Sequence, residues 1–150
     1  MHEIGGLRPL RRFAALAVVA GVILAACVGS ALVGPTPESR GLEGTSWRAV
    51  TIRDAAPIAG AEPTIHFDGD QAGGTTGCNT YGGAFHLDPD GTFLIGPMMM
   101  TEIACTGGRG AQEGVVVDLL SHAGHLEFLG GGRIRISGTA GAIEFEEVPG

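Results

Sequence analysis

The sequence predicts an α+β domain, a mostly antiparallel β-meander sheet with one short helix packed across it. Three observations predict this class. Short segments alternate apolar with polar residues, as strands with one buried face do. Glycine-rich and proline-containing breaks separate these segments, and the chain has 27 glycines and 8 prolines to supply them. Residues 111–123 carry helical spacing instead.

The first 26 residues have the features of an export signal. Arginines near the start precede an uncharged run over residues 13–26 that is rich in Ala, Val and Leu. A basic start and a short apolar stretch are typical of a signal peptide. The run ends in Leu24-Ala25-Ala26-Cys27, which resembles the lipobox of bacterial lipoproteins. That resemblance implies cleavage after residue 26 and a lipid anchor on Cys27.

A second interpretation keeps the signal uncleaved. The uncharged stretch continues to Gly34, which is long enough to span a membrane. Both interpretations place the following residues on the extracytoplasmic face, periplasmic or extracellular, of a cell membrane. Residues 27–41 contain Pro35 and Pro37 and no periodicity, so we expect a flexible tether there. The folded domain is then expected to cover residues 42–150.

Six short segments predict strands, because each alternates apolar and polar residues between turn signals. Asp88-Pro89-Asp90-Gly91 fits a type I turn that closes a hairpin. Glycines at 130–132 and within 138–141 supply two further reversals. The predicted strands are residues 64–67, 84–87, 92–95, 125–129, 133–136 and 142–146.

The predicted helix covers residues 111–123. Val116, Val117 and Leu120 fall at helical spacing with Glu113. Three consecutive valines at 115–117 weaken the local helix propensity, because β-branched side chains lose rotamer freedom in a helix.

The net charge of the chain limits the classes of partner that it can bind. Sixteen acidic residues against nine arginines and lysines give a formal charge of −7. An acidic surface repels phosphate backbones, so the sequence argues against a nucleic-acid partner.

Residues 77–83, Gly-Cys-Asn-Thr-Tyr-Gly-Gly, and 101–105, Thr-Glu-Ile-Ala-Cys, together resemble the META domain family, which includes the HslJ-type heat-shock lipoproteins. The resemblance extends from Leu42 to about Val148. It implies a fold and an envelope or secreted location, and it implies no catalytic residue and no cofactor. The motif residues are Gly77, Cys78, Asn79, Tyr81, Gly83, Thr101, Cys105 and Glu113.

Cys78 and Cys105 are the cysteines that remain once Cys27 carries lipid. Two cysteines in an oxidising compartment favour a structural disulfide. A reactive thiol pair is the alternative, but the gap between these cysteines is far longer than the two residues of a redox Cys-x-x-Cys motif.

The pattern His-x-Asp-x-Asp occurs twice, at residues 66–70 and 86–90. Alternate strand positions point the same way, so Zn²⁺ or Ca²⁺ could be held by such groups. The candidate ligands are His66, Asp68, His86 and Asp88. Aspartate beside glycine and proline is also what turns require, and the sequence favours that role.

The sequence contains neither a Gly-x-Ser-x-Gly elbow nor a His-Glu-x-x-His motif. We therefore expect a non-catalytic envelope lipoprotein with a structural or binding role in envelope stress. Its expected partners are the membrane, through Cys27, and an envelope protein or peptide. A metal-binding protein and an enzyme of unrecognised type remain the alternatives.

Overall fold

The computed structural model describes residues 39–149, which contain two helices and nine strands. The predicted signal peptide, Cys27 and the tether up to residue 38 lie outside these described residues. Among residues 39–149, no helix is both long enough and apolar enough to cross a membrane. The elements are α1 Ser39–Leu42, β1 Ser46–Ile52, β2 Thr64–Asp68, β3 Gln71–Thr75, β4 Thr80–Leu87, β5 Phe93–Ile95, β6 Met99–Met100, α2 Arg109–Ser121, β7 Ala123–Phe128, β8 Arg133–Gly138 and β9 Gly141–Glu147.

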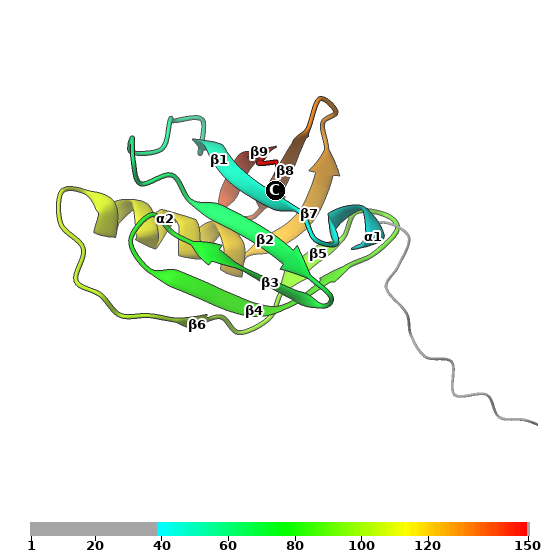
Figure 1. Ribbon diagram of the computed structural model, residues 1–150, viewed down its shortest axis with the longest axis horizontal. Helices are drawn as coiled ribbons and strands as arrows, with labels where there is room; N and C mark the ends of the chain where they lie inside the picture. Colours follow the sequence, from blue (N-terminus) through cyan, green and yellow to red (C-terminus); the bar gives the residue numbers. More distant parts are fainter. Residues whose placement is uncertain (1–38, 150) are drawn as a thin grey trace, which may run out of the picture. The chain divides into compact units, whose positions relative to one another are not determined.

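The strands form one antiparallel sheet in the order β5-β4-β3-β2-β1-β9-β8-β7, with β6 paired to β4. β1 pairs with both β2 and β9, so the first and last strands meet inside the sheet (Figure 1). The two ends of the sheet also approach each other, since Thr92 bridges His125 and Leu126 N donates to Gly91 O at 2.9 Å. The class is α+β, as predicted. The prediction of a simple meander was wrong, because these contacts make the sheet barrel-like and nearly closed.

The interior is filled by the alternate side chains of the strands. In β2 and β8 buried and more exposed residues alternate, as the sequence pattern predicted. Phe67, Phe85 and Phe93 pack together with ring centroids 5.0–6.3 Å apart. Helix α2 contacts β5, β8 and β9 and buries Val116, Leu119 and Leu120 against them. Each such buried side chain stabilises the fold by roughly 1.5–3 kcal/mol.

All six predicted strands overlap observed ones, and the predicted helix overlaps α2. The predicted hairpin is confirmed by the pairing of β4 with β5 and by Gly91 N donating to Asp88 O at 2.9 Å. The helical turn α1 begins inside the segment predicted as tether, and its last residue, Leu42, is fully buried. The first described helix therefore starts three residues before the predicted domain boundary.

Candidate functional site

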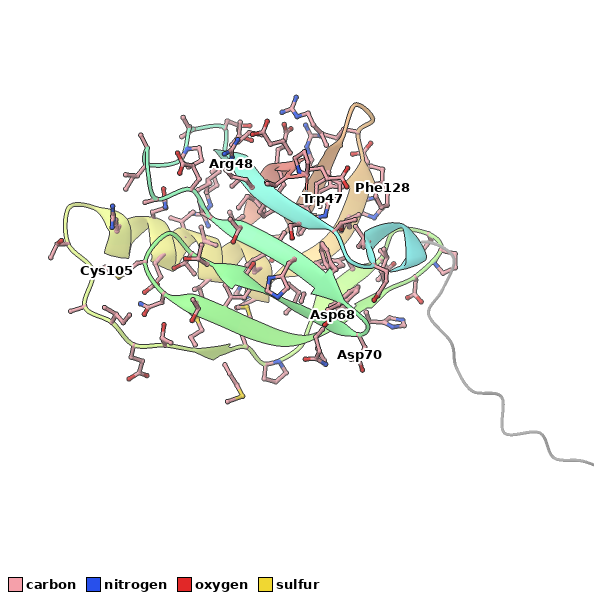
Figure 2. All side chains as sticks on the ribbon, in the orientation of Figure 1. Trp47, Arg48, Asp68, Asp70, Cys105 and Phe128 are labelled. Atoms are coloured by element: carbon pink, nitrogen blue, oxygen red, sulfur yellow. A yellow bond between two sulfur atoms is a disulfide. The ribbon has the colours of Figure 1, made fainter. Side chains whose placement is uncertain are left out.

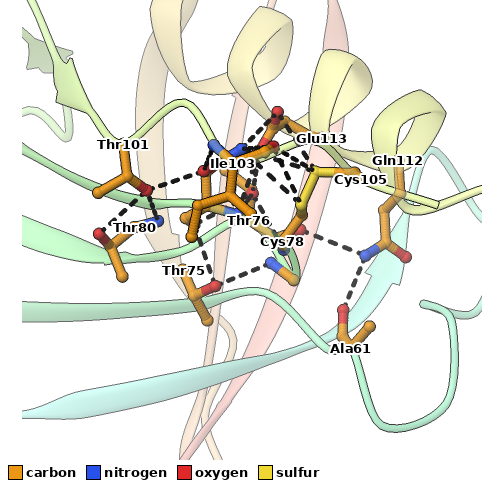
Figure 3. Close-up of a disulfide and its surroundings, with 12 residues drawn as sticks. Ala61, Thr75, Thr76, Cys78, Thr80, Thr101, Ile103, Cys105, Gln112 and Glu113 are labelled. Atoms are coloured by element: carbon orange, nitrogen blue, oxygen red, sulfur yellow. Dashed lines mark hydrogen bonds between the residues drawn. A yellow bond between two sulfur atoms is a disulfide. The ribbon is translucent and has the colours of Figure 1, made fainter.

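Three segments that are distant in the sequence converge beside helix α2. They are the β3–β4 turn at residues 76–79, the segment 101–105 after β6, and the first turns of α2 (Figure 3). Gly77 makes this approach possible. It adopts φ +92°, and a Cβ built there would lie 2.0 Å from Ala61 O and 2.6 Å from Gln112 Nε2 in α2, so a side chain would clash with both.

A disulfide joins Cys78 in the turn to Cys105 in the segment that leads into α2 (Figure 3). The two Cα atoms lie 6.0 Å apart, and both residues are half-buried. The predicted pairing is thus present in the structure. It holds the β3–β4 turn against the segment that precedes α2, beside the motif residues Asn79 and Glu113.

Asn79 occupies the centre of the cluster and is 2 % exposed. Its Nδ2 donates to Ile103 O and to Glu113 Oε1, both at 3.1 Å. Its Oδ1 accepts from Ile103 N at 2.7 Å and from Thr101 Oγ1 at 2.8 Å. A primary amide offers two donors and two acceptor sites, so this side chain is fully satisfied. It holds the 101–103 segment in place from both sides.

Glu113 closes the cluster from the helix side. Its Oε2 accepts from Thr76 Oγ1 at 2.7 Å and from Asn79 N at 3.2 Å, in addition to the Asn79 amide on Oε1. The Thr76 hydroxyl above all, and then the Asn79 donors, hold the pKa of Glu113 below its usual value, although partial burial opposes them. Because the folded pKa is lowered, this carboxylate stabilises the fold above its unfolded pKa and loses that contribution as the pH falls.

Two residues of the cluster, Thr76 and Gln112, were not predicted from the sequence. Thr76 is fully buried and binds both Glu113 and Asn79, and it directly precedes the Gly-Cys-Asn motif. Gln112 donates to Ala61 O at 2.7 Å and accepts from Ile58 N at 2.8 Å. The signals available were their positions beside the motif residues Gly77 and Glu113.

Tyr81 and Gly83 lie away from this cluster on β4. The Tyr81 hydroxyl donates to Thr64 O at 2.9 Å, and burial raises the pKa of Tyr81. A Cβ at Gly83 would lie 3.2 Å from Pro97 O, so glycine lets the 96–98 segment pack closely. These two motif residues support the packing of the sheet edge.

A shallow groove of about 550 Å³ runs between segment 100–104 and helix α2. Its walls combine apolar side chains with two carboxylates, Glu102 and Glu113, and its described lining includes no basic residue. Ile103 beside it is 64 % exposed. The lining residues are Asn79, Met100, Thr101, Glu102, Ile103, Ala104, Gly110, Glu113, Gly114 and Val117.

The four predicted metal ligands, from the two His-x-Asp-x-Asp segments, do not form a cluster. His86 Nε2 lies 2.9 Å from Asp88 Oδ1, while His66 and Asp68 are exposed on β2. In Figure 2, Asp68 lies toward the right of the view, near the end of β2, whereas Cys105 lies at the left. Within residues 39–149, the one group of three His, Cys, Asp or Glu ligand atoms close enough to hold an ion is Cys78, Cys105 and Glu113, and it includes none of the four. The His-x-Asp-x-Asp metal hypothesis therefore gains no geometric support.

The fold and site define a class of protein, a small strand-dominated α+β domain in which a disulfide and a buried asparagine hold the segment before the helix against the β3–β4 turn. Residues 40–147 match the model of the META domain. The chain belongs to the META domain family, as its motifs predicted.

Solved structures share the fold. An NMR structure of a protein from Burkholderia xenovorans matches with a TM-score of 0.60 and 24 % identity, covering 79 % of this chain and 94 % of that one. A second NMR structure matches with a TM-score of 0.61 and 14 % identity, covering 72 % and 92 % of the two chains. No curated protein matches the chain.

Proposed function

We propose that this protein is a lipoprotein anchored through Cys27 on the extracytoplasmic face of a cell membrane, and that its META domain is a non-catalytic binding module acting in envelope stress. The observation that carries the binding role is the groove between segment 100–104 and α2. Its volume of about 550 Å³ falls in the range of ligand-binding clefts. The Cys78–Cys105 disulfide favours an oxidising compartment.

The composition of the groove favours a peptide that is both apolar and basic. Met100, Ala104 and Val117 offer apolar contact, while Glu102 and Glu113 supply negative charge. After cleavage before Cys27 the chain keeps 15 acidic residues and six arginines, and its formal charge of −9 attracts a cationic partner from a distance. The occupant that fits best is an extended segment of an envelope protein with alternating apolar and lysine or arginine residues.

The chemistry of the groove supports a role without catalysis. A general base needs a pKa near the working pH and a free lone pair. Glu113 has a lowered pKa and already accepts three hydrogen bonds, so it is a weak base. It serves the architecture of the groove wall.

Gly114 allows the groove to be blocked without disturbing the fold. A Cβ at Gly114 would meet nothing within 4 Å, and leucine favours a helix more than glycine does. We expect Gly114→Leu to weaken binding of a lysine-containing apolar peptide by about tenfold or more, equivalent to about 1.4 kcal/mol. Fluorescence anisotropy with a labelled peptide on the full chain measures this.

Gly114→Ala is the matched control, because it removes the same glycine but leaves the groove open, and it should bind like the wild type. A peptide in which glutamate replaces lysine should bind at least tenfold more weakly. Equal affinity of both peptides, or unchanged binding by Gly114→Leu, would show that this groove is not the binding site.

The anchor is tested separately in cells. Cys27→Ala is expected to release the protein from lipid labelling, because the acyl chain is attached through the cysteine sulfur. Metabolic labelling with a fatty acid, followed by mass spectrometry of the purified chain, measures the attachment. A Cys27→Ala protein that still carries label would contradict the lipobox assignment, whatever the groove binds.

A further inference from the structure

The disulfide and Glu113, which also lines the groove, form a second arrangement, and the proposed peptide binding makes no use of its two sulfurs. Cys78 Sγ, Cys105 Sγ and a carboxylate oxygen of Glu113 all lie within 4.8 Å of one another, and each residue is half-buried (Figure 3). Thiolate and carboxylate are both established zinc ligands. While the disulfide is intact the sulfurs cannot ligate as thiolates, so any such site exists only in the reduced protein.

We propose that reduction of the Cys78–Cys105 bond creates a Zn²⁺ site from the two thiolates and Glu113. The disulfide takes up two electrons and two protons from a dithiol donor, which itself becomes a disulfide. The two thiols then release their protons to water as their sulfurs bind the metal. The redox state of this bond therefore determines whether Zn²⁺ can bind. Zn²⁺ binding does not require a peptide in the groove.

The distances require small movements. In a tetrahedral site with Zn–S near 2.3 Å and Zn–O near 2.1 Å, sulfur and oxygen ligands stand about 3.6 Å apart. Cys105 Sγ now lies 4.0 Å from Glu113 Oε1. The Cα atoms of the cysteines are 6.0 Å apart, so rotation of the two side chains suffices to separate the sulfurs. Partial exposure of both cysteines leaves the fourth position to water.

Asn79 is placed to support the charged ligands. Its Nδ2 lies 3.6 Å from Cys105 Sγ and 3.8 Å from Cys78 Sγ, and it already donates to Glu113. Two thiolates and a carboxylate around Zn²⁺ leave one excess negative charge, and donors aimed at ligand atoms stabilise such a set. The amide also fixes Ile103, so the neighbouring backbone is held in place before the metal binds.

The test uses the full chain in detergent, reduced with a phosphine. The phosphine does not chelate zinc strongly. It is oxidised to the phosphine oxide, which takes its oxygen from water. Zn²⁺ is titrated calorimetrically, and Co²⁺ replaces it to report thiolate ligation by its charge-transfer band. We expect one Zn²⁺ per reduced chain and none bound at this site in the oxidised chain. Near-UV circular dichroism records whether the reduced, metal-loaded chain keeps its native packing.

Glu113→Gln keeps both thiols and should weaken Zn²⁺ binding by at least about 10–100-fold, because loss of a group that only supports a metal ligand already has an effect of this size and Glu113 is proposed as a ligand itself. Glu102→Gln is the matched control for zinc, because it removes a neighbouring groove carboxylate that is not in the ligand group. The reduced Glu102→Gln chain should bind Zn²⁺ with the affinity of the wild type. Equal binding by oxidised and reduced chains, unchanged affinity in Glu113→Gln, or loss of native dichroism in the loaded chain would each overturn the proposal.

Discussion

Replacing Cys78 and Cys105 together by serine is expected to lower the free energy of unfolding by about 3.5 kcal/mol, the chain-entropy value for a cross-link between residues 27 apart in sequence. The bond restricts the unfolded chain, and in the folded state it joins the β3–β4 turn to the segment before α2. Small domains are stable by only about 5–15 kcal/mol, so this one bond carries a large share. Urea unfolding followed by circular dichroism measures the loss.

Reduction of the wild-type chain provides the control. A phosphine reductant in metal-free buffer should lower the stability of the wild type to about that of the double variant, and it should leave the double variant unchanged. The reduced wild type and the double variant both lack the cross-link, so their free energies of unfolding should agree. A double variant within about 1 kcal/mol of the oxidised wild type would show that the bond adds little.

The sequence predicted those parts of the fold that local rules govern. The alternation in Arg133–Gly138 and the turn residues between Asp88 and Gly91 specify a strand and a hairpin without reference to distant residues. Strand β3, Gln71–Thr75, was not predicted, because its two glycines lower β-propensity. A Cβ at Gly74 would lie 2.0 Å from Thr64 O, so its glycine reflects tertiary contact between strands.

The closure of the sheet could not be predicted from the local sequence either, because it also depends on contacts between distant strands. β1 pairs with β9, from nearly opposite ends of the domain, and no nearby residue encodes that choice of partner. Only some residues of the site were predicted, and the hydrogen bonds between them were not. The motif named Asn79 and Glu113, whereas the hydrogen bond between them and the role of Thr76 arise only where the turn meets the helix.

Asn79→Asp is expected to destabilise the domain by about 3–4 kcal/mol at neutral pH, since it removes buried donors and places a second carboxylate beside Glu113. In the wild type the Nδ2 of Asn79 donates to Glu113 Oε1 at 3.1 Å, where the variant carries an oxygen or a protonated carboxyl. Two carboxylates this close cannot both ionise cheaply, so one of them has a raised pKa. The cost should therefore shrink on acidification.

The direction of the pH response separates this charge effect from simple misfolding. The wild type has a lowered pKa at Glu113 and loses that contribution as the pH falls, whereas the variant should gain stability over the same acid range relative to the wild type. Adding Glu113→Gln to Asn79→Asp restores a donor–acceptor pair and should recover about 1–2 kcal/mol of the loss, although Glu113→Gln alone is destabilising. Urea unfolding of the four chains across the acid range measures both effects. Purely additive losses with parallel pH profiles would mean that Asn79 and Glu113 act independently, because only a shared hydrogen bond makes one substitution compensate the other.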